Sequence, residues 1–181
     1  METLRSVSAH EFEKKFGSLH RSIFARDGWD ALPFVPVEWE MVLVPYGCNM
    51  EEPDFHGLML AAEACGDREV IIADAETNLP SEAAVVIEAS FTAFEATKFR
   101  AGTNLAIMDI HLFGQSGQWG CVCAASHDDI GIVGGASIFM ERFLEAVGGL
   151  AALRGRFFEF ARTEWSIGEE VRSRLLEMVG W

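Results

Sequence analysis

The sequence predicts a single α+β domain in which an amino-terminal helix precedes a central, mostly antiparallel β-meander and carboxyl-terminal helices pack on the sheet. Three observations support this fold class. A capped amphipathic helix opens the chain, alternating polarity dominates the middle, and helical periodicity returns after Gly134-Gly135. No linker, repeat or low-complexity segment interrupts the 181 residues, a length within the usual range of one domain. Residues 1–181 are therefore expected to form one unit.

The amino-terminal helix has the clearest signals. Ser8-Ala9-His10-Glu11 has the S-x-x-E form of a capping box, in which each side chain satisfies a backbone N–H of the first turn. An apolar stripe follows at spacings of three and four residues, formed by Phe12, Phe16, Leu19 and Ile23. These signals predict a helix over residues 9–26.

Short apolar segments then predict three strands and a helix. Strands are expected at residues 41–44, 69–73 and 84–91. Asp54 is suited to cap a helix that reaches Cys65 and stops at the following glycine.

A β-hairpin is expected in the middle of the chain. Residues 105–113 and 118–125 alternate in polarity on either side of a Gly-Gln-Ser-Gly turn. If Phe113 pairs with Gln118, one face carries Asp109 and His111 and the other is the core face. The expected core-face residues are Met108, Ile110, Leu112, Trp119, Cys121 and Cys123.

The remaining elements follow from periodicity. A third strand at residues 130–133 extends the meander. Three amphipathic helices are expected over residues 138–147, 150–161 and 169–178, where apolar side chains recur at helical spacing.

Charge limits the classes of partner. The chain has 28 acidic and 14 basic residues, a formal net charge of −14 and a pI near 4.7. Such a field repels nucleic acid and anionic membrane surfaces, and it attracts a basic or amphipathic protein. The alternative is that the acidity serves solubility alone.

Four cysteines show neither a disulfide framework nor a paired C-x-x-C zinc signature. The first ten residues have no apolar secretory signal, and no segment has the length and hydropathy of a membrane span. The sequence therefore predicts a cytoplasmic protein, and nothing in it indicates a cofactor.

Two groups of polar residues are candidates for chemistry. Asp109 and His111 are two apart on a strand, so a carboxylate could orient an imidazole for acid–base work. His127-Asp128-Asp129 is the densest group of possible metal ligands. If a metal or catalytic site exists, its lining is expected to be Asp109, His111, His127 and Asp129. A half-solvated sheet face and an ordinary turn explain the same residues without chemistry.

Aromatic residues suggest contact surfaces. Trp29 and Trp39 flank a proline-containing connection and could line a groove for a protein partner. The alternative is that they clamp this connection onto the sheet. The aromatic carboxyl-terminal helices leave a homo-oligomer possible.

Two segments stand in a recognisable order: the hairpin Leu112-Phe113-Gly114-Gln115-Ser116-Gly117-Gln118-Trp119 and the later helix Ser137-Ile138-Phe139-Met140-Glu141-Arg142-Phe143-Leu144. This order of elements resembles bacterial toxin-immunity proteins of the SUKH type. The family's glycine-leucine-proline turn has only an echo at Ala31-Leu32-Pro33. The resemblance implies a small α+β module that binds and neutralises a toxin, and it assigns no site residue.

The sequence therefore supports two alternative functions. The first is a non-enzymatic, acidic protein-interaction domain, immunity-like or chaperone-like, because no coherent catalytic constellation accompanies the charge. The second is a small hydrolase or a ligand- or metal-binding domain that uses the Asp109/His111 face and the turn at residues 127–129.

Overall fold

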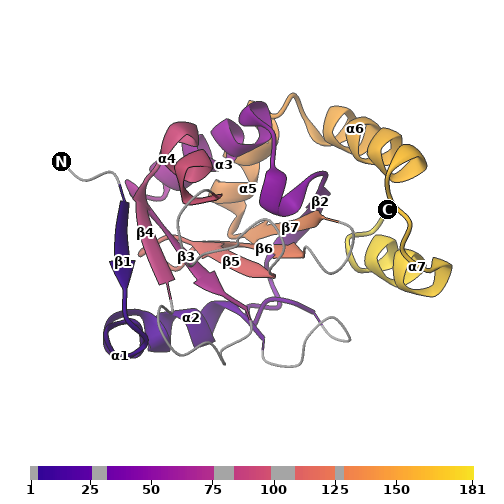
Figure 1. Ribbon diagram of the computed structural model, residues 1–181. Helices are drawn as coiled ribbons and strands as arrows, with labels where there is room; N and C mark the ends of the chain where they lie inside the picture. Colours follow the sequence, from indigo (N-terminus) through magenta and orange to yellow (C-terminus); the bar gives the residue numbers. More distant parts are fainter. Residues whose placement is uncertain (1–3, 26–31, 76–83, 99–108, 125–128) are drawn as a thin grey trace.

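A seven-stranded antiparallel sheet lies between two groups of helices in the computed structural model of the chain (Figure 1). The structure describes residues 4–25, 32–75, 84–98, 109–124 and 129–181. Across the sheet the strand order is β1-β4-β3-β5-β6-β7-β2. The prediction of an α+β domain with a central antiparallel meander is confirmed.

The strands match the predicted segments, with one addition. They are β1 (Leu4–Val7), β2 (Glu40–Val44), β3 (Glu69–Asp74), β4 (Ala84–Glu88), β5 (Ile110–Phe113), β6 (Trp119–Ala124) and β7 (Ile130–Gly135). The sequence did not predict β1, which is too short to show alternation. The fourth strand ends earlier than expected because Ser90 begins a helix: its side chain accepts from the backbone N–H of Ala93 at 3.3 Å.

The helical segments are α1 (Ala9–Phe12), a π-helical turn η1 (Glu13–Gly17), α2 (Ser18–Ile23), a 3₁₀ turn η3 (Gly47–Asn49), α3 (Glu52–Ala64), α4 (Phe91–Lys98), α5 (Ser137–Ala146), α6 (Leu150–Thr163) and α7 (Glu169–Met178). Ser8 caps the first of them, as predicted. The helical run ends at Ile23 rather than at residue 26, because Phe24 is extended and bridges to Phe34. No helix in the described part of the chain is long and apolar enough to cross a membrane.

The expectation that Asp54 caps the second helix is wrong. The helix α3 begins at Glu52, and Pro53 occupies its first turn, where a missing N–H costs nothing. Asp54 therefore lies inside the helix, and its carboxylate contacts Arg156.

Both faces of the sheet are covered. On one face, which we call the α3 face, buried side chains of the strands pack against α3, α4 and α5 (Figure 1). On the other, which we call the α2 face, they pack against α1, η1 and α2, and against parts of α6 and α7. All six residues of β6 are buried. The predicted core-face residues Ile110, Leu112, Trp119, Cys121 and Cys123 all lie on the α3 face, whereas Met108 is outside the described residues.

The register of the hairpin differs from the prediction by two residues. Phe113 pairs with Gly120 rather than with Gln118, and Leu112 pairs with Cys121. A shift of two residues leaves every side chain on its predicted face, because strand side chains alternate with a period of two. The longer turn, residues 114–118, is the physical reason for the shift.

A buried carboxylate holds that turn. Asp67 is 6 % exposed and follows α3. It accepts hydrogen bonds from the backbone N–H of Ser116 at 2.8 Å, from the Ser116 hydroxyl at 2.6 Å and from the Trp119 indole at 2.8 Å. Gly114 must lack a side chain here, since a Cβ would lie 2.0 Å from Asp67 Oδ2. Asp67 therefore fixes the hairpin register and orients Trp119 within the core.

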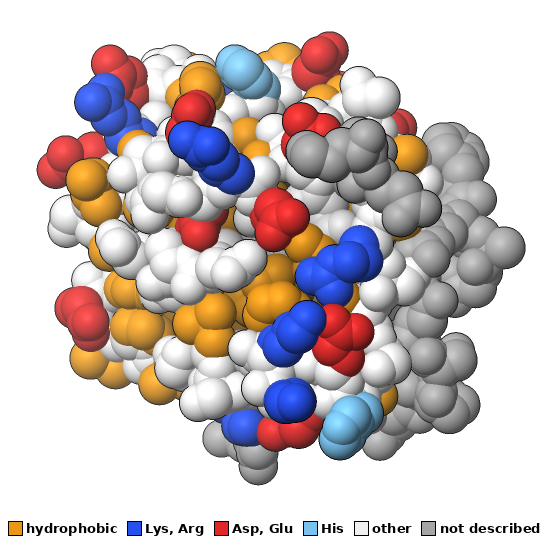
Figure 2. Space-filling model, turned by 90° about the vertical axis from the view of Figure 1, so that its left-hand side faces the viewer, with side chains coloured by type: hydrophobic (Ala, Val, Ile, Leu, Met, Phe, Trp, Pro, Cys, Tyr) orange, Lys and Arg blue, Asp and Glu red, His pale blue; other side chains and the backbone are white. Residues whose placement is uncertain are grey.

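The two edge strands of the sheet differ in their surroundings. At β1 the Arg5 guanidinium contacts Glu11 at 3.0 Å, and Lys15 contacts the same carboxylate at 2.6 Å. Figure 2 shows this side of the molecule, where hydrophobic side chains form a band and charged side chains lie around it. Charged residues on an edge strand oppose pairing with another sheet. The other edge strand, β2, leads into the site described below.

Replacing Asp67 tests the role of this carboxylate. Asp67→Ala removes three hydrogen bonds and leaves the Trp119 N–H buried without its acceptor. We expect the free energy of unfolding in urea to fall by about 2–4 kcal/mol. Glu63→Ala, on the exposed side of α3, is the matched control and should change it by about 0.5 kcal/mol or less. Equal effects of the two substitutions would contradict this role.

Candidate functional site

The sheet face that was expected to be half-solvated is covered by the amino-terminal helices. His111 on β5 lies on the α2 face, and its Nδ1 is 2.9 Å from Nε2 of His20 on α2. Its ring also stacks on Phe24, with 4.0 Å between centroids and 3° between planes. His111 is therefore part of the contact between α2 and the sheet, and no open polar face surrounds it.

Of the other members of the predicted lining, the structure describes Asp109 and Asp129. Asp109 lies directly before β5, where its carbonyl accepts from the backbone N–H of Ala75 at 2.9 Å. His127 and Asp128 lie outside the described residues. Within the part of the chain that the structure describes, no group of three His, Cys, Asp or Glu side chains is arranged to hold a metal ion.

Asp129 has a structural task. It adopts a left-handed conformation, with φ of 60°. Its carboxylate accepts from the backbone N–H of Cys48 at 2.7 Å and from the Asn49 amide at 2.8 Å, and its carbonyl accepts from Gly47 N–H at 2.6 Å. Asp129 thus holds η3 against the start of β7, which explains an acidic residue in this turn without a metal.

The predicted aromatic and thiol positions are also placed. Trp39 is 9 % exposed and packs against Phe34 at 5.5 Å, so it clamps the connection as the alternative proposed; Trp29 lies outside the described residues. Cys121 and Cys123 are buried in the core, with 3.7 Å between their sulfur atoms. Hydrogen bonds to Cys121 and Cys48, together with burial, raise the pKa of the Cys123 thiol well above its ordinary value.

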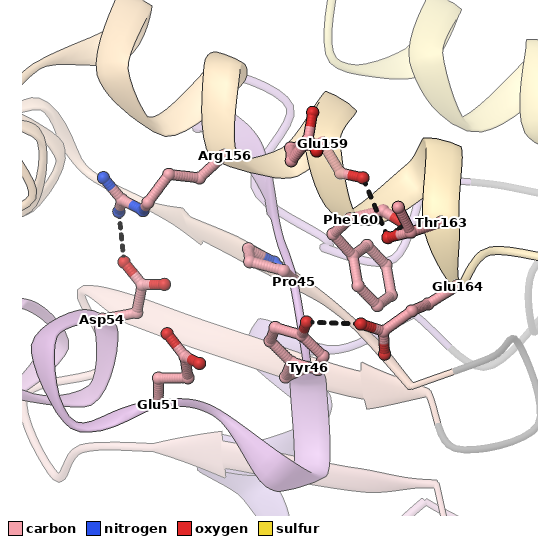
Figure 3. Close-up of a pocket in the computed structure, with 9 residues that line it drawn as sticks. All are labelled: Pro45, Tyr46, Glu51, Asp54, Arg156, Glu159, Phe160, Thr163 and Glu164. Carbon is pink, nitrogen blue, oxygen red and sulfur yellow. Dashed lines mark hydrogen bonds and ion pairs between the residues drawn. The ribbon is translucent and has the colours of Figure 1, made fainter.

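A cavity of about 360 Å³ lies between α6 and the connection from β2 to α3 (Figure 3). One wall comes from the segment after β2 and from the start of α3, and the other comes from one side of α6. Its lining residues are Pro45, Tyr46, Glu51, Asp54, Arg156, Glu159, Phe160, Thr163 and Glu164.

Tyr46 forms the aromatic part of the cavity. Its backbone is left-handed, with φ of 56°, which turns the chain sharply after β2. The ring meets Phe160 edge-on at 4.8 Å, and the hydroxyl donates to Glu164 Oε1 at 2.8 Å (Figure 3). The hydrogen bond to the Glu164 carboxylate raises the pKa of the Tyr46 hydroxyl, so the phenol stays protonated and keeps donating.

An ion pair forms the opposite end of the cavity. The Asp54 carboxylate is 3 % exposed and contacts Nη2 of Arg156, whose side chain is 41 % exposed. Nη1 of the same guanidinium donates to the Val147 carbonyl at 3.1 Å, just after α5. Arg156 thereby connects three helices, α3, α5 and α6, and it is engaged by protein groups on two sides.

The lining is strongly negative. It contains four carboxylates, from Glu51, Asp54, Glu159 and Glu164, and one guanidinium. None of the lining residues is His, Cys, Ser or Lys, and the Thr163 hydroxyl already donates to the Glu159 carbonyl at 3.1 Å. The carboxylates and aromatic rings of such a lining can bind a cationic group.

Sequence reasoning missed this site because its two walls are far apart in the chain. Residues 45–54 and 156–164 are separated by more than 100 positions. On α6, Arg156, Phe160 and Thr163 recur at spacings of four and three, which places them on one side of the helix. That pattern was visible, but nothing in the sequence indicated which segment it faces.

The buried end of the cavity can be tested by stability. Arg156→Met leaves the Asp54 carboxylate without its cation, and we expect the free energy of unfolding in urea to fall by about 2 kcal/mol. The double variant Asp54→Asn/Arg156→Met should recover part of that loss, because no buried charge remains. The control is Arg162→Met on the same helix, whose ion pair with Glu159 is exposed and contributes little to stability. An equal loss in Arg156→Met and Arg162→Met would contradict the role of the Asp54–Arg156 ion pair.

Comparisons with protein-family models, with curated proteins and with solved structures found no match to this chain. The resemblance to SUKH-type immunity proteins therefore stays a prediction from the sequence.

Proposed function

We propose that the protein is a non-enzymatic interaction domain that binds a basic segment of a protein partner at the cavity between α6 and the β2–α3 connection. The observation that carries this proposal is the lining of the cavity: carboxylates outnumber guanidinium groups four to one. A lysine or arginine side chain is the protein group that complements such a lining.

The geometry supports binding of a cation from outside. Asp54 is already neutralised by Arg156, and Glu159 contacts Arg162 at 2.5 Å, so both carboxylates have partners within the protein. Glu51 and Glu164 lie on the two walls, and Figure 3 shows the Glu51 carboxylate directed toward the space between them. A cationic side chain inserted there would lie beside these carboxylates and the Tyr46 and Phe160 rings.

The overall charge supports the same class of partner. A net charge of −14 raises the association rate with a basic protein and lowers it with nucleic acid or an anionic membrane. The local site then supplies the short-range contacts that long-range steering lacks. An immunity-type protein that covers a basic surface of a toxin would use both the long-range steering and the short-range contacts. A chaperone-like protein that covers a basic client would do the same.

Cytoplasmic location is part of the proposal. The four cysteines are free thiols, three of them buried, as is usual in a reducing compartment. For the immunity-type role, the direct genetic test is co-expression with the product of a neighbouring gene: a toxic neighbour whose toxicity this protein suppresses would support the role.

Binding of octalysine tests the site itself. The triple variant Glu51→Gln/Glu159→Gln/Glu164→Gln removes three lining charges while keeping the side-chain shapes. We expect its dissociation constant for octalysine, measured by calorimetry at low salt, to rise about 10-fold, since each exposed charge pair contributes up to about 1 kcal/mol.

The matched control is Glu38→Gln/Glu63→Gln/Glu141→Gln, which changes the net charge equally at exposed positions outside the cavity. Its dissociation constant should rise no more than about 2-fold. Equal weakening in both triple variants would show that octalysine follows net charge alone, and the proposed site would then be wrong.

A further inference from the structure

The contact between His20 and His111 joins the amino-terminal helices to the sheet. The two rings belong to residues 91 positions apart, on α2 and β5, and Nε2 of His20 lies 2.9 Å from Nδ1 of His111. The same helices also pack on the sheet through the buried side chains of Phe16, Ile23 and Phe24. Their two ends are fixed by β1 before α1 and by the Phe24–Phe34 bridge after α2.

Aromatic side chains surround the two imidazoles. Phe24 stacks on His111 and lies 5.0 Å from His20. Phe12 meets His20 edge-on at 5.6 Å, and Phe113 lies 5.5 Å from the same ring. Apolar surroundings of this kind favour neutral imidazoles, because a charged ring loses its hydration there.

The contact itself limits how many protons the pair can hold. In the neutral pair one ring nitrogen donates and the other accepts. A first added proton can enter on the donating ring without breaking the contact. A second would place two N–H groups against each other at 2.9 Å, so the doubly protonated pair cannot keep this geometry.

The neighbouring charges do not offset this limit. Glu13 on η1 and Arg21 on α2 act on His20, and they contact each other at 2.8 Å. Asp109 lies directly before β5, two residues ahead of His111. The residues paired with His111 on β3 and β6 are Ala73 and Val122, which carry no charge. Burial lowers the pKa of His20 to about 4, with a further lowering by Arg21, and burial and then His20 lower the pKa of His111 to about 3.

We propose that the His20–His111 contact is a pH-sensitive latch, which holds α1, η1 and α2 on the sheet when both rings are neutral and releases them in mild acid. In the released state both rings are hydrated and bind protons near their ordinary pKa of about 6.5. The closed state therefore binds fewer protons. The free-energy advantage of the closed state over the released state is therefore fully present above pH 6.5. It is lost progressively as the pH falls toward the lowered pKa values of the two rings in the closed state. Release would uncover apolar side chains of the α2 face, Phe113 and Val122 among them.

Hydrogen exchange measured by mass spectrometry tests the latch. After correction for the intrinsic pH dependence of exchange, protection of the amides in α2 should fall at least about 10-fold between pH 7.5 and pH 5. Protection in α5, on the other face of the sheet, should stay constant. The variant His20→Gln/His111→Gln, which cannot titrate, should lose the pH dependence, whereas the control His10→Gln/His56→Gln, at exposed positions, should keep it.

The latch is overturned if α2 protection does not change with pH, if α5 loses protection to the same extent, or if the double glutamine variant at residues 20 and 111 behaves like the natural protein. Should that variant fail to fold, titration of the natural protein decides by nuclear magnetic resonance. Two histidine rings that take up protons below pH 6.5 together with the loss of the native α2 signals support the latch. Rings that stay neutral at pH 5 while the α2 signals persist, or titration of every ring near pH 6.5, contradict it.

Discussion

The two-sided cover of the sheet is the constraint on which the rest of the structure depends. Strand side chains alternate between faces, so a strand with helices on both sides must be apolar throughout, and β6 has all six residues buried. Polar groups that fall on such a strand need partners within the protein. His111 meets His20, and the Trp119 indole meets Asp67.

The same constraint moves the binding surface to the edge of the sheet. Among the described residues β2 is the last strand at this edge of the sheet, and the chain turns sharply at Tyr46 before α3 begins. Asp129 holds that turn from the side of β7, and Arg156 holds α6 over it through Asp54. The residues that keep the cavity open are therefore structural, whereas Glu51 and Glu164 are available to meet a cation. The proposed function therefore uses a surface at the β2 edge of the sheet.

Much of the fold could be predicted from the sequence because periodicity and capping are local signals. Ser8 capped its helix, and the hairpin put Cys121 and Cys123 on the core face although its register was two residues off. The register depended on Asp67, whose contact with Ser116 spans 49 positions and has no local signature. Likewise β1 is short, and its partner β4 lies far along the chain.

The candidate site was less predictable, for a related reason. Local clustering of polar residues points to Asp109, His111 and residues 127–129, but it does not tell whether a second layer covers them. His111 became interior when α2 packed on it, and Asp129 was used to hold η3. The cavity arises from the packing of α6 against the β2–α3 connection, and its charge became visible only when both walls were placed.

Thiol labelling tests the two-sided cover most directly. Val122→Cys places a thiol on the α2 face of β6, between natural cysteines that face α3. At neutral pH the introduced thiol should react with iodoacetamide as slowly as those at positions 121 and 123, while Cys65, which is partly exposed, reacts faster. Fast labelling at position 122, with the neighbouring cysteines still protected, would show that the α2 face is open and would contradict this account.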